Sequence, residues 1–98
     1  MSFWLHDDAE RELGDAAVYY AEHATPKVAA SFLVEFERVV ALIQLNQQLG
    51  TRKAEGMRSY PFQRFPYSLV YREDADAGPQ VYAVAHQNRE PGYWQERQ

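Results

Sequence analysis

The spacing of apolar residues changes at Gly50, and this change constrains the fold more than any other feature of the sequence. Before Gly50, apolar side chains recur at steps of three and four residues, as on one face of an α-helix. After it, they occur in short runs separated by turn residues, as in β-strands. In a chain of 98 residues, this segregation predicts a single α+β domain over 1–98, with a helix pair packed on one face of a small antiparallel sheet.

The helical half is expected to contain two helices. An apolar stripe predicts the first over about Asp8–His23, with Asp7 or Asp8 as its N-terminal cap. The second begins at Thr25–Pro26, because threonine caps a helix and proline fits its first turn, and it runs to about Gln48, with Gly50 as the stop. Since only a few residues join the two helices, they should form an antiparallel αα-hairpin.

The other half contributes most of the sheet. A polar loop at Thr51–Gly56 is followed by an extended segment, Met57–Phe65, which is broken at Pro61. Two strands come next, at Tyr67–Arg72 and Gln80–Ala85. Asp74–Pro79 is the clearest turn signal, so the last two strands are predicted to form an antiparallel hairpin. With a short first strand at Ser2–Leu5, the predicted order is β-α-α-β-β-β. Pro91–Gly92 then breaks the chain, and Tyr93–Gln98 forms a short tail of about one helical turn.

Charge limits the classes of function that the chain can serve. Its net charge is −4, whereas domains that bind nucleic acids usually carry a basic excess because phosphate contacts dominate their affinity. A local basic face is still expected, because six arginines gather after Gly50: Arg52, Arg58, Arg64, Arg72, Arg89 and Arg97. The acidic average therefore weakens a nucleic-acid function without excluding it.

Several classes of site and location are disfavoured. The chain has no cysteine, which excludes disulfides and thiolate chemistry. Its histidines, at positions 6, 23 and 86, show no HxH or HExxH spacing, so we expect neither a metal nor a cofactor. Residues 1–8 do not resemble a signal peptide, and no apolar run approaches the roughly 18 residues of a membrane span. We therefore expect a cytoplasmic protein with no membrane partner.

Two runs in the second half of the chain resemble the RelE/ParE superfamily of bacterial toxins. They follow Arg58 and are FPYSLVYRED (Phe65–Asp74) and VYAVAHQNREPGYWQER (Val81–Arg97). Many relatives show an arginine on the second strand, a PY…V-Y-R third strand, and a fourth strand ending in V-x-H-x-x-R-x-P-x-Y-W. Asn46 departs from the pattern, because relatives often have a proline shortly before the glycine matched by Gly50. This departure concerns only the end of the second helix.

The resemblance implies the toxin of a type II toxin–antitoxin, or plasmid stabilisation, system, neutralised by a cognate antitoxin that wraps it with a helix or a strand. RelE-like members enter the ribosomal A site and cut mRNA, whereas ParE-like members poison DNA gyrase and lack the RNA-cutting residues. The chain has only two lysines, Lys27 and Lys53, which do not match a catalytic lysine pair. We therefore favour the ParE-like function. The expected partners are the antitoxin, in a hetero-oligomer, and gyrase or the ribosome as target, with a homodimer as a further alternative.

RNA cleavage through a 2′-hydroxyl requires a base, an acid and cations that stabilise the phosphorane. The candidates are Arg58, His86, Arg89 and Tyr93, with Arg64 as a further cation. An imidazole titrates near neutral pH, which suits acid–base catalysis, and Arg58 is expected to approach the other three. Each residue also has a structural interpretation: the histidine can satisfy a backbone group, the arginines can form ion pairs, and Tyr93 with Trp94 can cover the sheet.

Antitoxin binding is predicted over the helix pair and the edge of the sheet. Its candidate anchors are aromatic and arginine side chains, at Trp4, Tyr19, Tyr60, Arg64, Arg89 and Trp94. A third hypothesis, from another class, is a non-toxic binding module that retains the fold and pairs with an antitoxin-like protein. The fold alone does not decide among these three functions.

Overall fold

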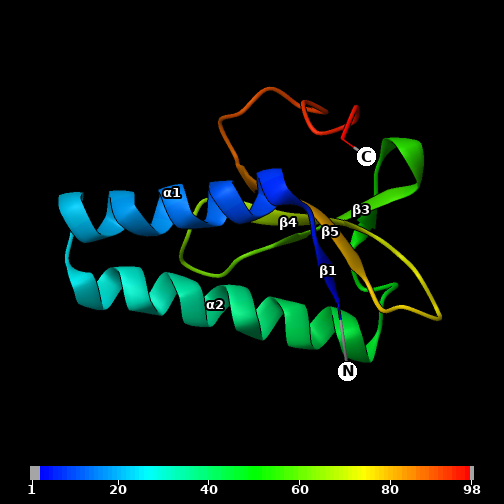
Figure 1. The fold of residues 1–98 in the computed structure, drawn as a ribbon, viewed down its shortest axis with the longest axis horizontal. Helices are drawn as coiled ribbons and strands as arrows, with labels where there is room; N and C mark the ends of the chain where they lie inside the picture. The colour runs from blue at the N-terminus through cyan, green and yellow to red at the C-terminus, as the bar shows by residue number, and fades with distance from the viewer. Residues whose placement is uncertain (1–2, 98) are drawn as a thin grey trace.

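The computed structural model describes residues 3–97 and contains two helices packed beside a five-stranded sheet (Figure 1). Its elements are β1 (Trp4–Leu5), α1 (Asp7–His23), α2 (Pro26–Leu45), β2 (Thr51–Arg52), a short 3-10 helix η1 (Ala54–Gly56), β3 (Met57–Pro61), β4 (Tyr67–Arg72) and β5 (Gln80–His86). The predicted α+β class and the order of helices and strands are confirmed. Ser2 and Gln98, the outer ends of the predicted first strand and tail, lie outside the described residues.

The first helix begins one residue earlier than expected and uses a different cap. His6 has extended backbone angles, and its Nδ1 accepts a hydrogen bond from the Asp8 N–H at 3.0 Å. The prediction that Asp7 or Asp8 caps the helix is therefore wrong. Both aspartates lie in the first turn instead, where a carboxylate interacts favourably with the positive end of the helix dipole.

The second helix begins as predicted but ends early. Thr25 is the cap, and its side chain accepts a hydrogen bond from the Val28 N–H at 3.1 Å. The helix ends at Leu45, about three residues before the predicted end, because Asn46 is extended and its side chain accepts a hydrogen bond from the backbone of Gln48. The turn before Gly50 is thus stabilised by an asparagine side chain.

Gly50 does not end the helix, since α2 stops five residues before it. It is needed for a close approach to β4. The Tyr71 hydroxyl accepts a hydrogen bond from the Gly50 N–H at 2.9 Å and donates one to the carbonyl of Gln47 at 2.7 Å. A Cβ atom on Gly50 would lie 2.7 Å from that hydroxyl oxygen, so any larger residue must displace the tyrosine.

The strands form one mixed sheet in the order β1-β5-β4-β3-β2. Neighbours from β5 to β2 are antiparallel, but β1 pairs in parallel with β5, so the expectation of a wholly antiparallel sheet is wrong. The segment Thr51–Gly56, predicted as a loop, begins with the two-residue strand β2, which pairs with β3. The β4–β5 hairpin is confirmed, with β5 extending one residue further, to His86.

A β-bulge in β5 directs two consecutive side chains to the same face of the sheet. Val70 and Tyr71 pair with Ala83 and Val81, so Tyr82 is the additional residue on β5. Tyr82 and Ala83 both lie on the face away from the helices, whereas Val81 packs with the helices. The bulge therefore shifts by one residue the alternation of β5 side chains between the two faces of the sheet, a few residues before β5 ends at His86.

Apolar side chains cover both faces of the sheet. Between sheet and helices lies the main core, which includes Phe32, Val39, Ile43, Leu69, Tyr71, Val81 and Val84. Burying one such large side chain contributes about 1.5–3 kcal/mol. On the opposite face a smaller cluster contains Met57, Val70, Tyr82, Ala83 and Trp94. Because Trp94 belongs to the tail, the C-terminal segment is part of the folded structure. Figure 1 shows that this segment turns back toward the start of α1.

Candidate functional site

The C-terminal tail is held against β5 and α1 by side chains that follow the Pro91–Gly92 break. Residues 91–96 form consecutive turns, with the Gln95 N–H donating to the Gly92 carbonyl at 3.0 Å. Gly92 has a φ of 79°, a left-handed conformation that favours glycine. The turn places Trp94 on the sheet, where it is 7% exposed. This arrangement brings Tyr93 and Arg97 to α1.

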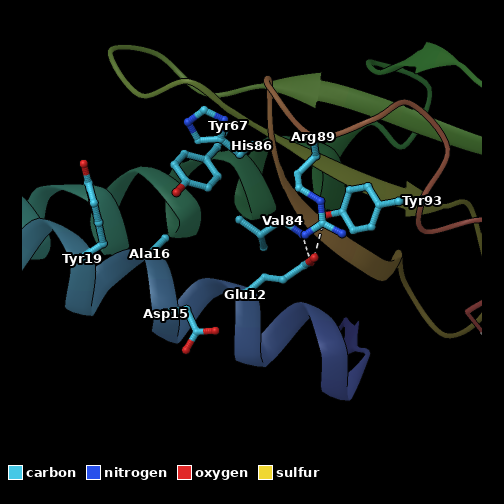
Figure 2. A pocket seen from close by; sticks show the side chains of 9 residues that line it. All are labelled: Glu12, Asp15, Ala16, Tyr19, Tyr67, Val84, His86, Arg89 and Tyr93. Atoms are coloured by element: carbon cyan, nitrogen blue, oxygen red, sulfur yellow. Dashed lines mark hydrogen bonds between the residues drawn. The ribbon is translucent and has the colours of Figure 1, made fainter.

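Glu12 of α1 receives four hydrogen bonds and connects three parts of the chain. Its carboxylate accepts from the Tyr93 hydroxyl at 2.6 Å and from two nitrogens of Arg97, each at 2.9 Å. It also accepts from the Val84 N–H, which β5 directs to its open edge, at 3.0 Å (Figure 2). Arg97 in turn donates to the carbonyl of Tyr82 at 2.9 Å. Glu12 and Arg97 together therefore satisfy the Val84 N–H and the Tyr82 carbonyl, two backbone groups at the edge of β5 that β1 does not reach.

The protonation of Tyr93 follows from this environment. Burial and the hydrogen bond to Glu12 raise the pKa of Tyr93 well above the ordinary value for a tyrosine. The same carboxylate raises the pKa of Arg97. Tyr93 is therefore a neutral donor to Glu12, and Arg97 is the cation that balances the Glu12 charge.

A hollow of about 250 Å³ opens between α1, the end of β5 and the tail. Its lining combines aromatic, apolar and charged groups, from Glu12, Asp15, Ala16, Tyr19, Tyr67, Val84, His86, Arg89 and Tyr93. The Arg89 guanidinium lies over the Tyr93 ring, 3.8 Å from its centre. The His86 ring meets Tyr67 edge to face at 5.0 Å, and its Nδ1 accepts from the Asn88 N–H at 3.0 Å. In Figure 2 the Arg89 side chain lies beside the Tyr93 ring, and the Glu12 carboxylate is hydrogen-bonded to the Tyr93 hydroxyl.

The structure thus brings three of the four candidate catalytic residues together, at His86, Arg89 and Tyr93. Arg58 lies elsewhere. It pairs across β3 and β4 with Tyr71, whereas His86 pairs with Tyr67, four residues earlier on β4. This offset is roughly 13 Å. The expectation that Arg58 approaches the other three is wrong, because β3 carries it to the far end of the sheet.

Arg58 has a local structural role. It is 8% exposed, its Nε contacts a carboxylate oxygen of Glu73 at 2.6 Å, and it donates to the carbonyl of Gly50 at 2.8 Å. These contacts join β3, β4 and the segment after α2. The arginine shared with the toxin pattern is therefore neutralised and largely buried.

The candidate partner-binding residues differ in accessibility. Trp4 and Tyr19 are 41% and 55% exposed. Arg64 is exposed in the β3–β4 loop with a φ of 70°, and Tyr60 is partly buried against the main core. Trp94, as its alternative interpretation anticipated, covers the sheet. These positions leave the partner-binding role itself a prediction.

Metal sites and membrane spans each place a requirement on the part of the chain that the structure describes. No group of three or more potential metal-binding side chains occurs within residues 3–97. No helix among these residues is long and apolar enough to cross a membrane.

Comparison with known proteins identifies the family. The model of the ParE toxin of the type II toxin–antitoxin system, parDE, matches residues 4–91. The chain belongs to the ParE toxin family. Among curated protein sequences, no relative matches the chain. A solved structure, the chromosomal ParDE toxin–antitoxin system from P. aeruginosa, matches with a TM-score of 0.74 and 21% identity, over 88% of this chain and 95% of that one. At this identity the structural likeness shows the fold alone.

Two residues of this ParE-family site were missed as site residues by sequence reasoning. Glu12 interrupts the apolar stripe of the first helix, between Ala9 and Ala16, and a carboxylate on a buried face requires a partner. Arg97 lies in the resembling tail and supplies that partner. The signal for Glu12 was present in the sequence. The signal for its pairing with the tail was not, because 85 residues separate the two positions.

Proposed function

We propose that this ParE-family chain is a toxin that a cognate antitoxin neutralises, and that it inhibits growth by acting on DNA gyrase without cutting RNA. One observation carries the proposal. Two of the four candidate nuclease residues are engaged in holding the fold: the Tyr93 hydroxyl donates to Glu12, and Arg58 is paired with Glu73. A group committed in this way is poorly placed to transfer a proton or to stabilise a phosphorane.

The charge of the chain supports the same proposal. RNA bound on the ribosome would have to approach α1, which carries six carboxylates, at Asp7, Asp8, Glu10, Glu12, Asp15 and Glu22. Arg97 and Arg11 neutralise only part of this charge. A polyanion would be repelled by the remainder.

Purified toxin can test the proposal directly. We expect it to inhibit DNA supercoiling by gyrase and to increase gyrase-linked DNA breaks, while a cell-free translation reaction keeps its mRNA intact. Addition of the antitoxin encoded beside the toxin should restore supercoiling. Intact supercoiling together with ribosome-dependent mRNA cleavage would contradict the proposal.

The second candidate function is a ribosome-dependent mRNA endonuclease, and one observation favours it. His86, Arg89 and Tyr93 line one hollow. If this function is correct, His86→Ala and Arg89→Ala should each abolish inhibition of translation. If both variants inhibit growth as the parent does, the endonuclease function is excluded.

The third candidate, a non-toxic binding module, makes a different prediction. It requires tight binding to the antitoxin-like partner with no effect on growth.

For the gyrase-directed toxin we also propose a cytoplasmic location, since gyrase acts on DNA in that compartment, and a role in plasmid stabilisation. Loss of an otherwise stable test plasmid after deletion of the toxin–antitoxin pair is the expected result.

A further inference from the structure

Arg89 is an arginine that the fold orients without neutralising. Within residues 3–97, four arginines pair with carboxylates: Arg11, Arg38, Arg58 and Arg97. Three others besides Arg89 form no salt bridge there: Arg52, Arg64 and Arg72. Arg89 differs from these three because it lines the hollow beside α1. Its guanidinium therefore has free hydrogen-bond donors at the edge of a concave surface.

The Arg89 side chain rests on a series of residues that are each held by a hydrogen bond or a ring contact. Its guanidinium lies on the Tyr93 ring, and the Tyr93 hydroxyl donates to Glu12. Glu12 is held by Arg97 and by the backbone of Val84. A side chain ordered before binding loses less conformational freedom when a ligand arrives, so each hydrogen bond contributes more to affinity. Tyr93 and Glu12 thus act as positioning residues for Arg89.

A second donor lines the same hollow. Because His86 Nδ1 accepts from the Asn88 N–H, the proton of a neutral imidazole lies on Nε2. Of the other lining residues, five are aromatic or aliphatic and two are carboxylates: Ala16, Tyr19, Tyr67, Val84, Tyr93, Glu12 and Asp15. The Glu12 charge is balanced by Arg97, which leaves Asp15 as the remaining acidic group. The exposed side chain of Val18 lies one residue before Tyr19 on α1. The hollow therefore suits one anionic group carried by an otherwise apolar segment.

Carboxylates and phosphates both match a guanidinium fork, and the surroundings decide between them. Asp15 is at the rim of the hollow with no partner among the described residues, and Figure 2 shows its carboxylate turned away from Tyr67. Together with the acidic first turn of α1, it would repel a chain of phosphates. A single carboxylate on a protein segment meets less of that repulsion than a chain of phosphates, and a neighbouring cation on the same segment can pair with Asp15.

We propose that Arg89, positioned by Tyr93 and Glu12, binds an aspartate or glutamate side chain of an amphipathic antitoxin segment that lies in the hollow between α1 and the tail. This inference rests on the proposed function, because it assigns the segment to the antitoxin. It adds the chemistry by which the toxin recognises that segment: a carboxylate for Arg89, apolar side chains for the tyrosine wall, and a basic residue near Asp15.

The test compares binding of the antitoxin encoded beside the toxin to three variants, by isothermal titration calorimetry. Arg89→Gln should weaken binding by about thirtyfold, as expected for an arginine that anchors a partner through charge-assisted hydrogen bonds. Arg89→Lys should weaken it by roughly tenfold, because lysine keeps the charge but not the planar fork. The matched control, Arg52→Gln, removes an unpaired arginine outside the hollow and should change affinity less than about twofold. Melting temperatures and amide spectra verify that each variant is folded.

Each outcome bears on a different statement. If Arg89→Gln binds the antitoxin as tightly as the parent, the inference is wrong, while inhibition of gyrase by the parent leaves the proposed function intact. If the parent fails to inhibit gyrase, and the Arg89→Gln variant binds the antitoxin more weakly than the parent, the proposed target is wrong and the inference stands. If labelled dT12 or rU12 binds at 50 mM salt through Arg89 while antitoxin binding does not depend on it, the ligand is a phosphate and the inference is overturned.

Discussion

Replacing Glu12 with glutamine tests the connection between the tail and the rest of the fold. The glutamate and arginine side chains of this pair are only 17% and 14% exposed. The amide would remove the charge that balances Arg97, and its NH2 group cannot accept the bonds from Tyr93 and Arg97 together. Breaking one partner of a fully buried pair costs about 3–5 kcal/mol. Since both groups keep some contact with water, we expect a loss of about 2 kcal/mol in the free energy of unfolding.

The assay is urea unfolding followed by circular dichroism. A loss of this size should lower the melting temperature of a domain of this length by roughly 10 °C. Hydrogen exchange at the Val84 amide should also accelerate, because its acceptor is the Glu12 carboxylate. The control is Glu22→Gln, which changes an exposed glutamate of the same helix and should stay within about 0.5 kcal/mol of the parent. If Glu12→Gln matches that control in both stability and exchange, the network does not stabilise the tail and the reasoning is wrong.

Three further predictions concern stability. Trp94→Ala should lower the free energy of unfolding by about 3 kcal/mol, because the ring is 7% exposed; a variant as stable as the parent in urea would show that the tail does not cover the sheet. Gly50→Ala should cost about 2 kcal/mol, because its Cβ would lie 2.7 Å from the Tyr71 hydroxyl oxygen; unchanged stability in the same assay would contradict this close approach. The hydrogen bond from Arg38 lowers the pKa of Glu35 below its ordinary value. The stabilisation from this pair is therefore fully present above the pKa of Glu35 in the unfolded chain, and it is lost as pH falls through the pKa of Glu35 in the folded chain. Stability measured from pH 7 to 3 should therefore fall less steeply in Glu35→Gln, and parallel curves would refute the assignment.

The helices and the main hairpin could be predicted because local signals agree with the tertiary fold. Thr25–Pro26 begins a helix through local chemistry, because the Thr25 side chain accepts from a backbone N–H of the first turn. Asp74 turns the chain in the same local way, because its side chain accepts from the backbones of Asp76 and Ala77. The parallel pairing of β1 could not be predicted in this way. It depends on how the helix pair returns the chain to the sheet, and two residues carry too little pattern to show their partner.

The candidate site could be predicted only in part for the same reason. The run from His86 to Tyr93 is local, so its residues were expected to lie together, and they line one hollow. Arg58 was expected there as well, but the register of β3 with β4 places it opposite Tyr71. No local rule sets that register. The partner of Glu12 depends on long-range packing as well, although its place on an apolar helix face signalled that a partner was needed.

We have proposed that this ParE-family chain acts on gyrase and does not cut RNA. The most direct measurement is brief induction of the toxin in bacteria that lack the antitoxin, recording a DNA-damage reporter and incorporation of labelled methionine together. We predict early activation of the reporter while methionine incorporation continues, with the same response from His86→Ala. An immediate stop in incorporation without reporter activation, relieved by His86→Ala, would contradict the proposed gyrase target.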